Sequence, residues 1–374
     1  MKRIAIFCDG TWNSPRAKNQ TNVVRLAEAV LPRDAGGTAQ MVIYQRGVGT
    51  RRSASGAVSI RDRILGGVLG NGLTANIEEA YKNLILAYEP GDEVLVFGFS
   101  RGAYTARSLV GMIRACGILP RRMLACVDEA MEYYRSRDPA TRPGDAESIA
   151  RRARMSPDVA TSGSDLDYRR AQGLPEATLL SIAYMGIWDT VGEHGVPSAF
   201  GVLAKMFNSV FQFHDAQLSS MVETARHAVA IDERRRLYPP ALWDNLDRLN
   251  GAATGAERPI QQLWFAGDHT AVGGGGGLCG LSSITLGWVA QGAQAAGLAL
   301  DDAMLAEMTQ DADPLAAISG IARAGLLVWV LRLMQADRTG VGGAPVDCGN
   351  IAPPARVRAE AIPGYHPVTI RHCL

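Results

Sequence analysis

Residues 93–117 read EVLVFGFSRGAYTARSLVGMIRACG, and they contain the most informative pattern in the sequence. It opens with the continuous apolar run Val94–Phe97, which is typical of a strand that is buried on both faces. Apolar residues then recur at helical spacing over Ala103–Ile113. Between the two segments, Gly98–Gly102 has the pattern G-x-S-x-G. A strand, this pattern and a helix in succession predict a nucleophile elbow, with Ser100 as the nucleophile.

The two glycines of the elbow have a steric reason. At Gly98 and Gly102 the sharp turn from strand to helix brings the backbone so close that a Cβ atom would clash. The turn also holds Ser100 in a strained conformation with its Oγ exposed. The N–H groups that begin the helix point to the same place and favour a developing anion. The alternative is an incidental serine in a surface turn, and the flanking strand and helix favour the nucleophile.

The composition describes an ordinary globular protein. The 374 residues are 47% hydrophobic and 20% charged, so the chain is long and apolar enough to bury a large core. Because 38 Lys and Arg stand against 37 Asp and Glu, the formal net charge is only +1. Nucleic-acid binding requires a basic surface, so we expect no nucleic-acid partner.

The cysteines and the amino terminus predict a cytoplasmic location. The six cysteines show no C-x-x-C pair and no regular spacing, so we expect reduced, mostly buried thiols. The first apolar run, Ile4–Cys8, ends at Asp9 after five residues and is too short for a signal peptide. No stretch approaches the length of a transmembrane helix. Export by a secretion system that needs no signal peptide stays open.

Apolar strands and helices alternate along the chain. We expect strands at residues 4–8, 41–44, 94–97, 178–188, 227–231 and 260–266. Besides the elbow helix, we expect helices at residues 22–31, 74–88, 196–213, 283–298 and 315–334. Asn76 and Glu79 are placed to form a capping box for the second of these. Strands that are apolar throughout and end in polar clusters indicate an α/β protein with a mainly parallel sheet, whose ligands bind at the carboxyl ends of the strands.

We predict a single domain over residues 1–374. Residues 120–175 contain many arginines and prolines and little apolar periodicity. We expect them to form an inserted excursion of helices and loops without sheet. Residues 335–374 are expected to form a loop-rich tail.

A serine nucleophile needs a base to take its proton and an acid to orient that base. His269 follows the last predicted strand and precedes a glycine-rich turn, so it can lie at the same sheet edge as Ser100. It also fits the chain order nucleophile, acid, histidine. For the acid we favour Asp189, which closes the strand after the elbow in a tight turn. Asp232 closes the next strand and is the alternative, although a salt-bridged strand end explains it equally well.

Acyl transfer also needs two N–H donors for the oxyanion of the intermediate. Arg101, the residue after the nucleophile, is expected to supply the first. The turn Gly10–Thr11 is expected to supply the second, because the first strand should lie beside the elbow strand. Asp9 and Asn13 are expected to brace this turn by hydrogen bonds.

Other chemistries find little support. The Asp9-Gly10-Thr11 turn is similar to the D-x-D-G-T motif of haloacid dehalogenase phosphatases, but Phe7 stands where the nucleophilic aspartate is needed. The glycine run at residues 273–277 is not followed by the lysine of a phosphate-binding loop, so we expect a flexible turn there. No metal-ligand motif is present. We therefore predict neither a metal nor a cofactor.

With these residues in place, the chain resembles an α/β-hydrolase family whose members include type VI secretion phospholipase effectors. The resemblance rests on FCDGTWN at 7–13, GVGT at 47–50, GFSRGA at 98–103, WDTVG at 188–192, residues 227–234 and residues 264–275. It implies an α/β-hydrolase-like fold and a Ser-Asp-His lipase or esterase. Carried over, it gives Ser100 as the nucleophile and His269 as the base.

One position departs from the family pattern. The family usually reads G-x-H-S-D-V-G-G-G where this chain reads GDHTAVGGG at residues 267–275. Ala271 therefore replaces the aspartate that follows two residues after His269. If that aspartate is the family's catalytic acid, this chain is impaired unless Asp268 or Asp189 takes its place.

These observations predict hydrolysis of a carboxylic ester through an acyl-Ser100 intermediate. A phospholipid-like substrate is implied by the resemblance alone. The apolar segment 196–213 is expected to be either a lid or interfacial helix, in transient contact with a membrane surface, or an ordinary core helix. The competing class is a catalytically impaired hydrolase-fold protein that binds a ligand or partner, with Ala271 as its main support. The sequence leaves the oligomeric state open.

Overall fold

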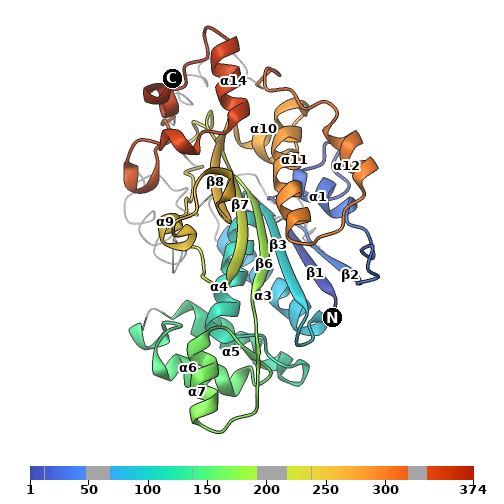
Figure 1. Ribbon diagram of the computed structural model, residues 1–374, viewed down its shortest axis with the longest axis vertical. Helices are drawn as coiled ribbons and strands as arrows, with labels where there is room; N and C mark the ends of the chain where they lie inside the picture. Colours follow the sequence, from blue (N-terminus) through green and yellow to red (C-terminus); the bar gives the residue numbers. More distant parts are fainter. Residues whose placement is uncertain (12, 48–67, 137, 192–216, 237, 319–334) are drawn as a thin grey trace.

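A six-stranded sheet forms the centre of the protein, in the order β2-β1-β3-β6-β7-β8 (Figure 1). The structure is a computed structural model of residues 1–374, and it describes all of them except residues 12, 48–67, 137, 192–216, 237 and 319–334. The strands of the sheet are β1 (Arg3–Cys8), β2 (Gln40–Gln45), β3 (Glu93–Phe99), β6 (Ile182–Trp188), β7 (Val222–Ala230) and β8 (Ile260–Phe265). Each neighbouring pair is parallel. The predicted α/β class with a mainly parallel sheet is confirmed.

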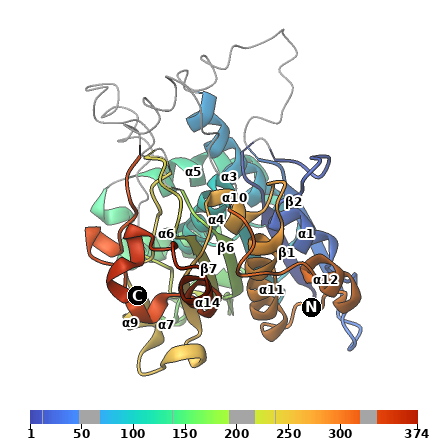
Figure 2. The same ribbon diagram turned by 90° about the horizontal axis from the view of Figure 1, so that it is seen from above.

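Helices surround the sheet, as the view from above shows (Figure 2). The α-helices are α1 (Asn22–Glu28), α3 (Val68–Ala87), α4 (Arg101–Cys116), α5 (Val127–Arg135), α6 (Ala146–Met155), α7 (Gly163–Ala171), α9 (Leu246–Asn250), α10 (His269–Gly273), α11 (Gly280–Ala295), α12 (Asp302–Thr309) and α14 (Pro353–Ala361). The short 3-10 helices are η1 (Arg121–Cys126), η2 (Pro139–Thr141), η4 (Gly255–Glu257), η5 (Val341–Gly343), η6 (Cys348–Asn350) and η7 (Val368–Cys373).

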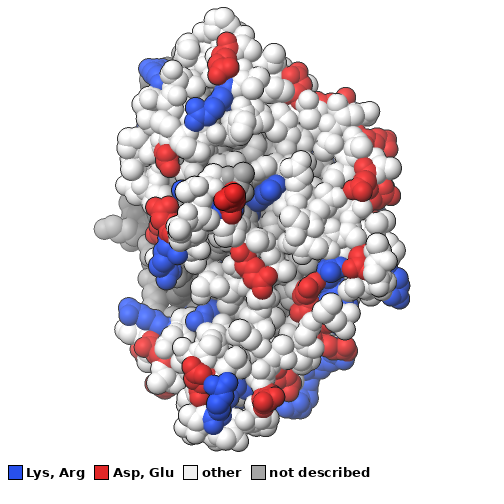
Figure 3. Space-filling view, in the orientation of Figure 1, with Lys and Arg blue, Asp and Glu red and all other residues white. Residues whose placement is uncertain are grey.

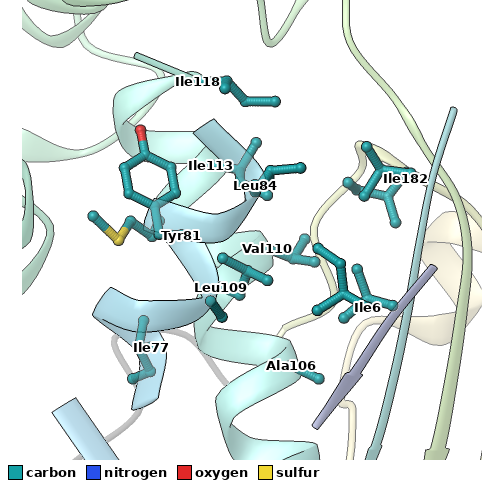
Figure 4. Packing of buried hydrophobic residues seen from close by; sticks show 14 of the residues in the cluster. Ile6, Ile77, Tyr81, Leu84, Ala106, Leu109, Val110, Ile113, Ile118 and Ile182 are labelled. Carbon is teal, nitrogen blue, oxygen red and sulfur yellow. The ribbon is translucent and has the colours of Figure 1, made fainter. Parts of the chain in front are cut away.

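The central strands are apolar throughout because both faces of the sheet are covered. Successive side chains of a strand point to opposite faces. Ile4 and Ile6 of β1 accordingly pack in the cluster under α3 and α4, where Ile6 lies close to the apolar side chains of α4 (Figure 4). Ala5 and Phe7 face the other way, into the cluster that includes residues of α1 and α11. Phe7 stacks on Phe97 of the elbow strand with ring centroids 4.5 Å apart.

Helix α3 begins earlier than predicted. It starts at Val68, so Asn76 lies inside the helix and the predicted capping box is wrong. Leu73 and Ile77 are buried on the inner side of α3, and burial of this apolar face outweighs a local start signal. The Asn76 side chain instead donates to the carbonyl of Arg46 at 3.2 Å. The predicted helix at 196–213 and most of the one at 315–334 lie outside the described residues.

The segment from 120 to 175 folds into helices at the end of the sheet where the strands begin (Figure 1). It contains η1, α5, η2, α6 and α7. The expectation that it holds no sheet is wrong, because β4 (Val159–Ala160) pairs in parallel with β5 (Thr178–Leu179). The single strand predicted at 178–188 is consequently divided into β5, which belongs to this small sheet, and β6 of the central sheet.

Residues 335–374 pack against the β7–β8 side of the sheet. Val346, Ile351 and Ile370 form an apolar cluster with Val229 of β7 and Trp264 of β8. The segment also carries α14 and three short 3-10 helices, η5, η6 and η7.

A disulfide joins two of the six cysteines, so the prediction of uniformly reduced thiols is wrong for Cys348 and Cys373. The two residues are separated by 25 positions in the sequence, and only the fold of the tail brings them together. The other four cysteines are free thiols. Burial raises the pKa of the Cys8 and Cys116 thiols to about 12, which keeps both protonated.

On the face shown in Figure 3, no large area of the surface carries charged side chains of one sign only. Acidic and basic side chains are interspersed there, with uncharged surface between them. Within the part of the chain that the structure describes, no helix has both the length and the apolar character needed to cross a membrane.

Candidate active site

Ser100 lies at the turn between β3 and α4. Its φ of 59° and ψ of −124° place it in a conformation that residues other than glycine rarely adopt, so the predicted strain is present. A Cβ atom on Gly98 would come within 2.5 Å of the Gly102 carbonyl oxygen, and one on Gly102 within 2.1 Å of the Cys8 carbonyl oxygen. The predicted steric need for both glycines is confirmed.

A series of hydrogen bonds connects Ser100, His269 and Asp189. The Ser100 Oγ lies 2.7 Å from His269 Nε2, and His269 Nδ1 lies 2.6 Å from Asp189 Oδ2. The three residues follow β3, β8 and β6, at the carboxyl ends of parallel strands in one sheet. All three are buried, with Asp189 fully inaccessible. The expectation that the elbow leaves the Ser100 side chain exposed is therefore wrong, because Ser100 is only 5% exposed. Such a series can take the proton from a serine hydroxyl and stabilise the imidazolium that forms.

The imidazole of His269 is held on several sides. Asp268 caps the amino end of α10, so that His269 is the first residue of this helix. The ring packs between Phe99, at a centroid distance of 4.6 Å, and Tyr238, at 5.0 Å. The backbone N–H of His269 donates to Glu233 Oε2 at 3.3 Å. These contacts leave the ring little freedom to turn away from Ser100.

Asp189 occupies a second strained position, with a φ of 37°. Its Oδ1 accepts the backbone N–H of Ala230 at 2.9 Å. Arg338 makes a bidentate ion pair with the same carboxylate, with Nη1 2.5 Å from Oδ1 and Nη2 2.9 Å from Oδ2. Burial alone would raise the pKa of Asp189, but the charges of Arg338 and His269 and their hydrogen bonds hold it well below the usual range.

The alternative acids make other contacts. Asp232 Oδ2 accepts from the Gly267 N–H and from the Tyr365 hydroxyl, each at 2.7 Å. Asp268 Oδ1 accepts from the backbone N–H groups of Thr270 and Ala271. The replacement at Ala271 therefore does not leave His269 without a carboxylate, because Asp189 is bonded to it.

His227 supports the turn that carries Asp189, a role that no pattern in the sequence indicated. It is fully buried, and its Nε2 accepts the backbone N–H of Thr190 at 3.3 Å. Its Nδ1 lies 2.9 Å from Gln262 Oε1. Burial, together with the charge of Arg107, lowers the pKa of His227 to about 3. A neutral ring that donates through Nδ1 and accepts through Nε2 satisfies both contacts.

The turn after β1 lies next to Ser100, because β1 pairs directly with β3. A Cβ atom on Gly10 would come within 3.4 Å of Ser100 Cβ. Asp9 braces the turn as expected: its Oδ1 accepts the Gly10 N–H at 2.7 Å, and its Oδ2 accepts the Tyr44 hydroxyl at 2.6 Å. The Gly10 N–H is thereby occupied. The prediction of an oxyanion donor in this turn is therefore restricted to the Thr11 N–H.

The buried Asp9 carboxylate is also the acceptor for Thr21 at the start of α1, with its Oγ1 2.9 Å from Asp9 Oδ1. Burial raises the pKa of Asp9, and these hydrogen bonds act in the opposite direction. The Thr11 hydroxyl is buried and has no hydrogen-bond partner among the described residues. The turn next to Ser100 therefore carries the Thr11 hydroxyl as well as the Thr11 N–H.

Gly47 is packed so closely on this turn that Gly47→Ala should disturb it. An added Cβ atom would lie 1.7 Å from the Gly10 carbonyl oxygen, so the Gly10–Thr11 backbone must move. We expect kcat for an ester substrate to fall about 100-fold, because a displacement of about 1 Å at a catalytic group has effects of this size. Gly163→Ala is the matched control, since nothing lies within 4 Å of its added Cβ. Equal activities of the two variants would show that the turn has no part in the reaction.

In the glycine run at 273–277, Gly273 and Gly274 make close contacts, whereas a Cβ atom added to Gly276 or Gly277 would meet nothing closer than 3.6 Å. A Cβ atom on Gly273 would come within 1.9 Å of the Phe99 ring, which itself contacts His269. The Gly275 N–H donates to the Gln20 carbonyl at 3.0 Å. The run thus connects α10 to the segment that precedes α1.

A cavity of about 750 Å³ lies apart from these residues, between α4, the inserted helices and α9. Arg107, Arg114 and Trp243 are among the residues that line it. Ser100, His269 and Asp189 are not, so this cavity is not where a bond would be cleaved by Ser100.

In the described part of the chain, one group of side chains is close enough together to hold a metal ion. The potential ligand atoms of Cys348, His372 and Cys373 lie within 4.8 Å of one another. Both cysteines are engaged in the disulfide, which leaves no thiolate to bind a metal ion. His372 Nε2 lies 2.8 Å from the Val346 carbonyl oxygen. The group therefore does not fit a metal centre in its present state.

The protein has a parallel sheet, and a serine, a histidine and an aspartate form a hydrogen-bonded series at the carboxyl ends of its strands. These features define the class of α/β proteins with a serine-hydrolase arrangement. Residues 2–292 match the family described as T6SS, phospholipase effector Tle1-like, catalytic domain, and the chain belongs to this family. Arg338 lies outside the matched residues.

Individual relatives are more distant. The chain is 28% identical over 242 residues to the uncharacterized protein YEL023C of Saccharomyces cerevisiae (strain ATCC 204508 / S288c). This match covers 63% of the chain but only 31% of the yeast protein, so the chain spans about a third of that relative's length.

Two solved structures are similar at low scores. A crystal structure of an uncharacterized protein from Pseudomonas aeruginosa gives a TM-score of 0.42 at 19% identity, over 88% of this chain and 52% of that one. The structure of the Tle1 effector bound to the VgrG spike of the type 6 secretion system gives a TM-score of 0.39 at 17% identity, over 73% and 51%. The chain spans about half the length of each.

Proposed function

We propose that this protein is a serine hydrolase that cleaves carboxylic ester bonds in phospholipid-like lipids. The observation that carries the proposal is the hydrogen-bonded series from Ser100 Oγ through His269 to Asp189, with distances of 2.7 and 2.6 Å. The lipid class of the substrate comes from membership in the Tle1-like phospholipase effector family. Export by a type VI secretion system belongs to the same proposal and rests on the family alone.

In the first half of the reaction, Ser100 Oγ attacks the acyl carbonyl carbon while His269 Nε2 takes the hydroxyl proton. The imidazolium that forms is stabilised by Asp189. The tetrahedral intermediate carries an oxyanion, for which the Arg101 N–H at the start of α4 and the Thr11 N–H are the donors. Collapse of the intermediate breaks the ester bond, and the imidazolium gives its proton to the leaving alcohol.

In the second half, a water molecule attacks the acyl-Ser100 ester. His269 Nε2 now takes a proton from the water and returns it to Ser100 Oγ as the second tetrahedral intermediate collapses. The products are a fatty acid and the free enzyme. Neither half requires a metal or a cofactor.

The test combines labelling with a substrate panel. A fluorophosphonate probe should modify the purified, folded protein at Ser100, and phospholipid vesicles and p-nitrophenyl esters should both be hydrolysed. Ser100→Ala should abolish labelling and lower kcat at least 1000-fold. Ser108→Ala is the matched control, because Ser108 is also a buried serine of α4 and has no part in the series. An adduct that persists in Ser100→Ala would contradict the proposal.

The other interpretation, an impaired hydrolase-fold protein that binds a ligand or partner, makes the opposite prediction for the same experiment. The folded wild-type protein would neither react with the probe nor hydrolyse any ester in the panel. Ala271 motivated this interpretation, and the contact between Asp189 and His269 weakens it.

A further inference from the structure

Arg338 belongs to a segment that is fixed to the rest of the protein immediately before it. Gln335 forms an antiparallel bridge with Arg235, and the Ala336 N–H donates to the Arg234 carbonyl at 2.8 Å. The Arg234 Nε lies 2.9 Å from Asp337 Oδ1. The backbone that carries Arg338 is therefore held in register with the stretch that follows β7.

From this position the guanidinium group reaches the interior. Arg338 is only 5% exposed. Besides the two bonds to Asp189, Nη1 donates to the Ala230 carbonyl at 3.0 Å and Nη2 to the Tyr238 carbonyl at 2.8 Å. Both terminal nitrogens are thus fixed by backbone acceptors as well as by the carboxylate. A planar fork held in this way imposes its own plane on the carboxylate that it binds.

The orientation of Asp189 follows from these contacts. Oδ1 accepts from the Ala230 N–H and Arg338, while Oδ2 accepts from Arg338 and faces His269 Nδ1. Without Arg338, Oδ1 would keep one bond and Oδ2 would keep only the histidine. The carboxylate would then be free to rotate about its terminal torsion, which is broad.

We propose that Arg338 is a positioning residue of the active site, which fixes the Asp189 carboxylate toward His269 and offsets part of its negative charge. This inference rests on the proposed serine-hydrolase function. The offset has a definite consequence. A carboxylate that is paired with a guanidinium stabilises an imidazolium less than an unpaired carboxylate does. Arg338 also holds the pKa of Asp189 well below its usual range, so the carboxylate stays ionised to a lower pH.

Other charged and titratable groups face this centre and must be considered in any pH profile. They are His227 of β7, Glu233 with its partner Arg235, Tyr238, Asp268 at the start of α10, and Arg107 of α4. Although burial raises the pKa of Glu233, Arg235 lowers it overall, so this group stays ionised. His227 stays neutral above its pKa of about 3. Neither of these two groups changes its charge in the neutral range.

The experiment compares Arg338→Met with Arg338→Lys and with Arg234→Met. The last is the matched control, because Arg234 holds the same segment through Asp337 but does not contact Asp189. For Arg338→Met we expect kcat to fall about 100-fold with KM within about 3-fold, since Arg338 orients a catalytic group and does not touch the substrate. The acidic limb of the kcat/KM profile should move to higher pH, because the pKa of Asp189 rises when the charge and hydrogen bonds of Arg338 are lost. Arg338→Lys should keep the position of the limb and recover part of kcat.

An activity-independent readout separates this inference from the proposed function. In an NMR titration, the side-chain carboxyl signal of Asp189 should show protonation at a higher pH in Arg338→Met than in wild type. If the wild-type protein fails to react with a fluorophosphonate, the serine-hydrolase proposal fails, while the titration still reports on the Arg338–Asp189–His269 contact.

The inference is overturned if Arg338→Met loses activity equally at every pH and the titration of Asp189 is unchanged. It is also overturned if Arg234→Met produces the same shift, because the effect would then come from the segment and not from the guanidinium. Circular dichroism of each variant identifies a loss of fold, and Arg338→Lys carries the test where Arg338→Met does not fold.

Discussion

Asp189→Asn is expected to lower kcat for ester hydrolysis about 10,000-fold, with the fold retained. The amide cannot stabilise an imidazolium by charge, and its NH₂ group disfavours the histidine tautomer in which Nε2 accepts the Ser100 proton. The substitution also leaves Arg338 buried without its counter-charge, so a lower stability is expected as well. Steady-state kinetics with a p-nitrophenyl ester, at a temperature well below the unfolding transition, measures the effect.

Asp232→Asn is the control for this prediction. Asp232 is partly buried at the same edge of the sheet, but it accepts hydrogen bonds from Gly267 and Tyr365 and does not contact His269. An asparagine oxygen can still accept both bonds, and burial already raises the pKa of this carboxyl. We expect kcat to change less than about 10-fold. The reverse result, a larger loss in Asp232→Asn than in Asp189→Asn, would make Asp232 the acid.

Arg152→Met is expected to lower the free energy of unfolding by about 3–5 kcal/mol, because it removes one partner of a buried ion pair. Arg152 and Asp165 join α6 to α7, and both side chains are almost fully buried. The Arg152 Nε lies 2.7 Å from Asp165 Oδ2, and Nη2 donates both to Asp165 and to the Pro143 carbonyl. Urea unfolding followed by circular dichroism gives the difference in free energy.

The pH dependence of this difference has a definite sign. Burial raises the pKa of Asp165, but the hydrogen bonds and charge of Arg152 and the hydrogen bonds from Thr161 outweigh burial and lower it overall. A lowered pKa in the folded state contributes stability above the unfolded value of about 3.9, and this stability is lost as the pH falls through the folded pKa. The gap between wild type and Arg152→Met should therefore be largest near neutral pH and narrow below about pH 4.

An exposed pair in the same inserted segment is the control. Arg170 and Asp167 are three residues apart on α7, and their side chains are 77% and 75% exposed. Such pairs contribute little, so Arg170→Met should change the free energy of unfolding by less than about 1 kcal/mol. A similar loss in both variants would mean that the stability of this segment does not depend on the buried pair.

The local parts of the fold could be predicted because their signals are local. The apolar run before Gly98 indicated a buried strand, and the G-x-S-x-G pattern indicated a strained turn at Ser100. His269 and Asp189 were chosen because they follow predicted strands, and parallel strands end at one edge of a sheet. The structure brings both side chains to Ser100 for this reason.

Predictions that depended on competing contacts were less accurate. The start of α3 was placed six residues late, since core packing of its inner face extends the helix beyond the local start signal. Gly10 was expected to offer its N–H to an oxyanion, but the neighbouring Asp9 carboxylate takes it. A carboxylate and an N–H group one residue apart can bond or point away, and nothing in the sequence distinguishes the two.

The sequence alone was enough to predict the class of fold, the strained turn at Ser100 and the placement of Ser100 and His269 after apolar strands, because each strand and the turn that follows it form a local pattern. Only the tertiary structure decided that Asp189, and not Asp232, contacts His269, that Cys348 and Cys373 are bonded, and that Arg338 reaches Asp189 across 149 positions of sequence. A buried ion pair between distant segments has no pattern in the sequence. Its energy depends on distance and burial, which exist only when the chain is folded.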